Sequence, residues 1–124
     1  MSGTNLVADT NIILYLFNGD NFIADLLNEI QVYISFITEL ELLSFKSLTL
    51  SEQKKIESFL QECTIIDVTP TIKQTAIKFC KEYSLKLPDA IISATAHFLN
   101  LPLLTADKAM KKVKDIDIVL FEKE

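Results

Sequence analysis

The chain has 124 residues, of which 49% are hydrophobic and 23% are charged, and this composition excludes a disordered tail. The formal net charge of −5 at pH 7 excludes a general attraction for nucleic acid, so any RNA site needs positive charge supplied locally. No apolar run approaches the roughly 20 residues that a transmembrane helix needs, and the N-terminus is unlike a signal peptide. We therefore expect a single cytoplasmic domain, residues 1–124, without membrane contact.

The first half of the chain predicts strands that alternate with helices. In chain order these are a strand over 5–9, a helix over 11–17, a helix over 20–30, a strand over 32–36 and a helix from near Thr38 to about Phe45. In the helix over 20–30, apolar residues recur with the i, i+3, i+4, i+7 spacing of an amphipathic helix. Asp20 is a suitable N-cap for that helix.

The second half continues the alternation. In chain order we expect a helix from near Thr49 or Ser51, a strand over 65–68, a helix from Pro70 to about Tyr83, an apolar helix from Pro88 to Leu99, a strand over 102–105, a short helix over 107–113 and a strand over 118–121. This order predicts a three-layer α/β/α domain with a mostly parallel central sheet of four to five strands. Ligands of such sheets bind at the carboxyl ends of the strands, where the strand order reverses.

Four acidic residues fall at that carboxyl edge. Asp9 ends the first strand, Glu41 follows the second, Asp89 opens the apolar helix and Asp107 follows the fourth strand. Two like charges about 4 Å apart cost on the order of 4 kcal/mol at an effective dielectric constant near 20. A divalent cation removes this repulsion, and oxygen ligands alone select Mg²⁺ or Mn²⁺.

Each acid also has an ordinary structural interpretation, which the sequence leaves open. Asp9 and Asp107 are suitable helix caps, and Asp89 would complement a helix dipole. Glu41 follows a threonine by three residues, as in a capping box. Glu39 is a rival for the site, but on a helix it points about 200° away from Glu41, so only one of them faces it.

The residues that match a known family are the segments VADTNIILYLF, YISFITELELLSF, LKLPDAIISATAHFLNLPLLTADKAMKKV and DIVLF. With these segments in this order, the sequence resembles PIN-domain proteins over most of the chain, and among them the VapC-type toxins of bacterial toxin–antitoxin pairs. The resemblance implies a hydrolase, an endoribonuclease that depends on Mg²⁺ or Mn²⁺. By position, the catalytic and metal-holding acids of the family match Asp9, Glu41, Asp89 and Asp107. The supporting polar residues match Thr10, Asn11 and Thr105.

Within this resemblance, Asp9 and Asp89 are expected to be the inner metal ligands, and Asn11 is expected to brace Asp9 by a hydrogen bond. The chain departs from the family pattern at two places. Leu43-Ser44-Phe45 follow Glu41, where the family often has a glycine, and Ala109-Met110 stand where it often has an acid and a phenylalanine. Neither departure removes an expected metal ligand, but both affect the choice of substrate.

The partners follow mainly from the resemblance, which implies an RNA substrate, a small antitoxin that covers the site, and a homodimer. We expect Lys108, Lys111 and Lys112 to share a helix face and to contact RNA phosphates; the alternative is an ordinary solvated face. The apolar segment 12–17 belongs either to the core or to an interface. Cys63 and Cys80 have neither zinc-site nor disulfide-framework spacing, so we expect two reduced thiols.

Two other functions remain open. One is a catalytically silent PIN-fold scaffold that binds RNA or protein, although a scaffold has no need of four repelling carboxylates. The other is a phosphatase with Asp9 as its nucleophile, which usually has a second acid two residues later, where this chain has Asn11. A ribonuclease mechanism with two histidines is excluded because His97 is the only histidine.

Overall fold

The computed structural model describes residues 5–122, and its strands form one parallel sheet in the order β3-β2-β1-β4-β5. The strands are β1 (Asn5–Ala8), β2 (Gln31–Ser35), β3 (Thr64–Ile66), β4 (Leu103–Thr105) and β5 (Ile118–Leu120). Val7 in β1 pairs with Tyr33 of β2 on one side and with Leu103 of β4 on the other. The prediction of a mostly parallel sheet is confirmed, with five strands and every pairing parallel.

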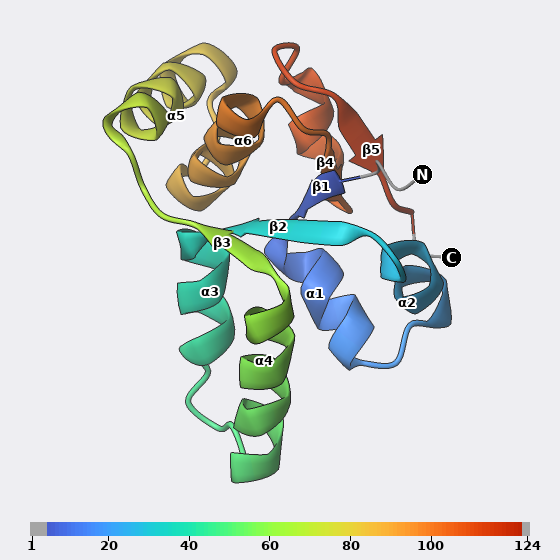
Figure 1. Cartoon of the computed structure of the whole chain (residues 1–124). Coiled ribbons are helices and arrows are strands. Elements are labelled where there is room, and N and C mark those ends of the chain that lie inside the picture. Colours follow the sequence, from blue (N-terminus) through green and yellow to red (C-terminus); the bar gives the residue numbers. More distant parts are fainter. Residues whose placement is uncertain (1–4, 123–124) are drawn as a thin grey trace.

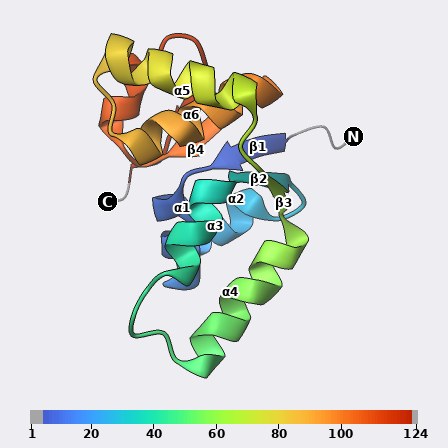
Figure 2. The ribbon, with the colours of Figure 1, turned by 90° about the vertical axis from the view of Figure 1, so that its left-hand side faces the viewer.

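Helices cover both faces of this sheet. They are α1 (Thr10–Phe17), α2 (Asn21–Leu27), α3 (Phe36–Leu43), α4 (Leu50–Glu62), α5 (Pro70–Tyr83), α6 (Leu87–Leu99) and a short 3₁₀ helix, η1 (Lys108–Lys112). Figure 1 shows α5 and α6 on one side of the sheet and α1, α3 and α4 on the other, and Figure 2 shows the same layers after a quarter turn. The predicted three-layer α/β/α arrangement is therefore confirmed. Within residues 5–122, no helix is both long enough and apolar enough to cross a membrane.

Strand periodicity divides the core between the two faces. Leu6 and Ala8 of β1 pack into a cluster with α1, α2, α3 and α4, whereas Val7 between them packs with α5 and α6. Alternate side chains of a strand point to opposite faces, so β1, β2, β3 and β4 each contribute to both clusters. Helix α6 is apolar almost all round because it lies between the sheet and α5.

The apolar segment 12–17 belongs to the core. Ile12 and Ile13 are fully buried, and the partly buried Tyr15, Leu16 and Phe17 pack against the same cluster. The rings of Phe17 and Phe59 meet edge to face at 5.4 Å, which joins α1 to α4. The segment therefore attaches α1, and with it Asp9, to the rest of the fold.

The helix caps account for most of the element boundaries. Asp20 caps α2, Thr49 and Glu52 form a capping box at α4, and Pro70 occupies the first turn of α5 behind the Thr69 cap. Strand and helix ends otherwise coincide with expectation or differ from it by at most three residues.

Two local predictions are wrong. Helix α3 begins at Phe36 rather than near Thr38, because the Ser35 hydroxyl accepts a hydrogen bond from the Ile37 N–H (3.1 Å) and caps the helix directly after β2. The segment after Asp107 is a 3₁₀ helix, with three residues per turn, so residues four apart do not share a face. Lys108 and Lys111 are aligned there, and Lys112 lies on the next face.

Candidate active site

The acidic site lies at the point where the strand order reverses. β1 runs between β2 and β4, and the chain passes from β3 at one edge of the sheet to β4 on the other side of β1. Asp9 follows β1 directly, and three of the predicted acids line one hollow of about 480 Å³ there. The lining residues are Asp9, Thr10, Asn11, Leu14, Glu41, Ser44, Phe45, Asp89 and Ile92. The sequence thus predicts correctly where Asp9, Glu41 and Asp89 meet.

Asp9 occupies the N-cap position of α1, but its side chain does not cap the helix. Instead, the Thr105 hydroxyl donates a hydrogen bond to Asp9 Oδ2 (2.6 Å), and the same hydroxyl accepts one from the Asp107 N–H (3.0 Å). The side chain of Asp9 therefore joins the carboxyl ends of β1 and β4. In the described chain, Thr105 makes the hydrogen bond that was expected from Asn11, which is exposed at the rim.

Glu41 accepts a hydrogen bond from one threonine, and a second threonine on another helix is hydrogen-bonded to the first. The Thr10 hydroxyl donates to Glu41 Oε1 (2.6 Å) and also lies 3.0 Å from the hydroxyl of Thr38. Because the single proton of Thr10 is directed to Glu41, Thr38 must donate to Thr10. The capping-box interpretation of Glu41 does not hold, since Ser35 is the N-cap and Thr38 lies fully buried inside α3.

Asp89 lies in the first turn of α6, where an acid that only complements the helix dipole would have a lowered pKa. Its pKa is raised instead. Burial is the largest cause, and the charges of Asp9, Asp107 and Glu41 add to it, while Lys86 opposes them. The surroundings of Asp89 are therefore those of an acid crowded by other acids.

Asp107 caps a helix, which is the ordinary structural interpretation of this acid. Its carboxylate accepts a hydrogen bond from the Ala109 N–H (2.9 Å) and so caps η1. Asp107 does not line the hollow, yet its charge raises the pKa values of Asp9 and Asp89. It acts on the other acids through space.

The pKa of Asp9 is also raised, again mainly by burial and further by the charges of Asp107 and Glu41. Only 5% of Asp9 is exposed. The hydrogen bond from Thr105 acts in the opposite direction and lowers this pKa, because it stabilises the charged carboxylate. The Thr105 hydroxyl thus favours an ionised carboxylate at a buried position.

The donor set suits a hard divalent cation. Carboxylate and hydroxyl oxygens surround the hollow, and a cation would relieve the repulsion that raises the pKa values of Asp9 and Asp89. Among residues 5–122, no three His, Cys, Asp or Glu side chains converge into a preassembled metal cage.

Sequence reasoning missed two side chains of this site. Thr38 was assigned only a capping role, although its spacing of three residues from Glu41 places both on one face of a helix. Phe45 carried no signal beyond its departure from the family pattern, yet it lines the hollow while 47% exposed.

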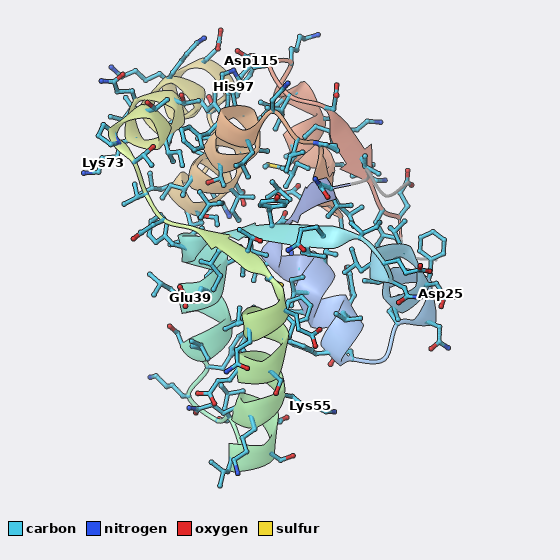
Figure 3. All side chains as sticks on the ribbon, viewed as in Figure 1. Asp25, Glu39, Lys55, Lys73, His97 and Asp115 are labelled. Carbon is cyan, nitrogen blue, oxygen red and sulfur yellow. The ribbon has the colours of Figure 1, made fainter. Side chains whose placement is uncertain are left out.

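The remaining reactive side chains lie elsewhere. His97 lies near Asp115 at the opposite end of the molecule from α4 (Figure 3), where both line a separate polar hollow. Cys63 and Cys80 are free thiols, and burial raises the pKa of Cys63 to about 11, which makes it a poor nucleophile.

Most of the chain matches a known protein family. The family model described as PIN domain matches residues 6–116. A toxin–antitoxin complex from Klebsiella pneumoniae contains a chain with 30% sequence identity and a TM-score of 0.84, covering 95% of this chain and 99% of that one. No curated protein matched the sequence.

Two further solved structures share the fold. VapBC2 from Rickettsia felis, bound to a DNA fragment from their promoter, contains a chain with 22% identity and a TM-score of 0.81, covering 96% of this chain and 100% of that one. DNA-bound VapBC from Salmonella typhimurium contains a chain with 19% identity and a TM-score of 0.81, covering 94% of this chain and 97% of that one.

Proposed function

This chain belongs to the PIN domain family, and from that membership we propose that it is an endoribonuclease that depends on Mg²⁺ or Mn²⁺ and is the toxin of a toxin–antitoxin pair. The observation that carries the proposal is the placement of Asp9, Glu41 and Asp89 around one hollow at the switch point of the sheet. Buried acids with raised pKa values at such a crevice, here Asp9 and Asp89, are typical of a functional site.

In this proposal the residues of the chain have separate tasks. Asp9 and Asp89 hold the cation, and Glu41 and Asp107 orient water or help to hold a second ion. A bound divalent ion supplies Lewis-acid chemistry: it polarises a phosphoryl oxygen and lowers the pKa of water. Thr105 favours the ionised form of Asp9, and Thr10 fixes the direction of the Glu41 carboxylate.

The two alternatives have less support. A scaffold has no use for carboxylates such as Asp9 and Asp89, whose pKa values are raised by burial and by neighbouring acids, since each lowers stability when ionised. A nucleophilic Asp9 would have to reach phosphorus, but Oδ2 accepts the Thr105 hydrogen bond and the residue is almost fully buried. A covalent phospho-aspartate trapped on Asp9 would instead support the phosphatase hypothesis.

Removal of divalent metal tests the proposed function directly. We expect the purified chain to cut total cellular RNA in millimolar Mg²⁺, to stop cutting in excess EDTA, and to recover when Mg²⁺ or Mn²⁺ is restored. Gel electrophoresis with 5′-end mapping provides the readout. Cleavage that continues in EDTA at the same positions would contradict a metal-dependent mechanism.

The lysines of η1 are proposed to contact RNA phosphates beside the site. Lys108, Lys111 and Lys112 are all exposed and directly follow Asp107. Replacing Lys111 and Lys112 by alanine should weaken RNA binding and reduce the slope of log affinity against log salt by about 0.7 for each phosphate that is no longer neutralised. Filter binding at several salt concentrations measures the slope.

The matched control replaces Lys54 and Lys55 by alanine. Both are exposed on α4, and Lys55 lies at the opposite end of the molecule from Asp115 (Figure 3). This control should keep the slope of the unmodified chain. An equal slope in both double variants would show that the η1 lysines are an ordinary solvated face.

We further propose that the whole chain, residues 1–124, acts as one domain that pairs as a homodimer and is inhibited by a small antitoxin. The match to a chain of the Klebsiella complex supports the antitoxin. Light scattering on the purified chain checks the dimer. Co-purification with the product of a neighbouring open reading frame checks the antitoxin.

A further inference from the structure

Two chemically different sets of side chains line the hollow at the acidic site. Asp9, Glu41 and Asp89 are its carboxylates, and Leu14, Phe45 and Ile92, which we call the apolar wall, are its large apolar members. A metal ion with its waters would contact the carboxylates. An exposed apolar member could contact a neutral group of the molecule that carries the reacting phosphate.

Phe45 is the exposed member of the apolar wall. Ile92 is buried and Leu14 is half-buried, whereas Phe45 is 47% exposed and lies two residues beyond the end of α3. The Ser44 hydroxyl bonds to the Leu40 carbonyl, and the Ser44 N–H donates to the Glu41 carbonyl (3.4 Å) at the end of α3. Phe45 follows directly and lines the same hollow as Glu41.

Charge alone does not explain how a polyanion enters this hollow. None of the described residues that line it is a lysine, arginine or histidine, and the chain as a whole has a net charge of −5. A nucleobase is neutral, and every base has a face that stacks on an aromatic ring. Stacking therefore supplies affinity that does not depend on charge and adds to the contacts of the phosphates with the proposed cation.

We propose that Phe45 is a stacking platform for an unpaired nucleobase next to the scissile phosphate. This inference rests on the proposed ribonuclease function. Paired bases are already stacked and enclosed in a helix, so they cannot cover the ring. Other exposed apolar side chains of this region, Leu40, Leu43 and Leu50, do not line the hollow, which separates Phe45 from them.

The test measures binding with two probes of equal backbone charge. One is a fluorescein-labelled single-stranded RNA of eight nucleotides, and the other is the same ribose-phosphate chain without bases. All proteins carry Asp89→Asn to prevent cleavage. We expect this parent to bind the RNA roughly 5- to 150-fold more tightly than the abasic chain, the range that stacking of one base provides.

Variants at Phe45 show whether the preference for bases needs an aromatic ring or only an apolar side chain. Phe45→Leu should remove most of the preference for bases and leave binding of the abasic chain unchanged, while Phe45→Tyr, which keeps a ring, should preserve the preference. The matched control is Phe98→Leu on α6, because Phe98 is 45% exposed and lies outside the hollow. That variant should behave like its parent.

A Phe45→Leu variant that keeps the full preference for bases overturns the inference and assigns the ring to a protein-docking surface. An equal loss in Phe98→Leu also overturns it. Failure of the proposed ribonuclease function can be told apart from failure of this inference. It would appear as a lack of RNA cleavage by the chain with Asp89 intact. Base-dependent binding that requires Phe45 would still support the platform in that case.

Discussion

Asp89→Asn should lower the rate of RNA cleavage at least about a hundredfold relative to the unmodified chain, because the variant would lose a charged ligand of the proposed cation. Changes to groups that only support a metal ligand commonly cost 10- to 100-fold, and the loss of the ligand itself costs at least as much. The variant still folds. The pKa of Asp89 is raised, so its ionised form opposes folding and a neutral amide of the same shape is tolerated.

A matched substitution distinguishes the loss of a site residue from a change in the net charge of the chain. Asp25→Asn removes the same single charge from an exposed position on α2, where Asp25 lies at the periphery of the molecule (Figure 3). It should cleave RNA at the rate of the unmodified chain. Circular dichroism confirms folding of both variants, and initial rates on one RNA at fixed Mg²⁺ compare them. Asp89→Asn that cleaves at an unchanged rate would remove Asp89 from the catalytic set.

Thr105→Val destabilises the fold by about 1.5–3 kcal/mol at neutral pH, the usual contribution of a hydrogen bond to a charged group. Thr105 is fully buried, and its hydroxyl is the side-chain donor to the buried carboxylate of Asp9. Valine fills the same space without a donor, so the charge stays buried and loses this hydrogen bond. The free energy of unfolding in urea measures the effect.

The cost of Thr105→Val should depend on pH in a definite direction. Burial raises the pKa of Asp9 above its ordinary value of 3.8, so the folded state binds a proton more readily than the unfolded state. Ionisation of Asp9 therefore lowers stability as pH rises from that value through the raised pKa. The Thr105 hydrogen bond offsets this loss only while Asp9 is charged, so the cost is largest at neutral pH and shrinks in acid.

Two further variants complete this experiment. Thr105→Ser keeps the hydroxyl and should lose less than half as much stability as the valine variant. Asp9→Asn removes the buried charge, and in that background Thr105→Val should cost clearly less than it does beside the carboxylate. A double-mutant cycle with no coupling between the two positions would contradict a functional hydrogen bond between them.

Periodicity and caps predict most of the fold. The alternation of apolar strands with amphipathic helices is enough for a parallel three-layer domain, and Asp20 and Pro70 mark helix starts as local chemistry requires. The placement of Asp9 at the carboxyl edge follows from topology alone, since it directly follows a parallel strand. Asp89 opens a helix that comes after another helix, so its place beside Asp9 depends on the packing of α6. These features depend on local sequence and on simple packing rules.

The remaining details depend on contacts between distant residues. Thr10 and Thr38 are 28 positions apart, and their shared hydrogen bond follows from how α1 and α3 pack, which no local pattern specifies. The replacement of Asn11 by Thr105 as the donor to Asp9 likewise follows from the pairing of β1 with β4. The 3₁₀ form of η1 separates residues that an α-helix would align, so the face expected for Lys112 is wrong.

The measurement that tests the central claim most directly is a map of new RNA 5′ ends in cells that express either the unmodified chain or Asp89→Asn, both without an inhibitor. The proposal predicts discrete new ends with the unmodified chain only, and their positions would identify the RNA that is cut. No new ends with either protein, when both are folded and equally abundant, would contradict the ribonuclease and favour a scaffold that keeps the fold without the activity.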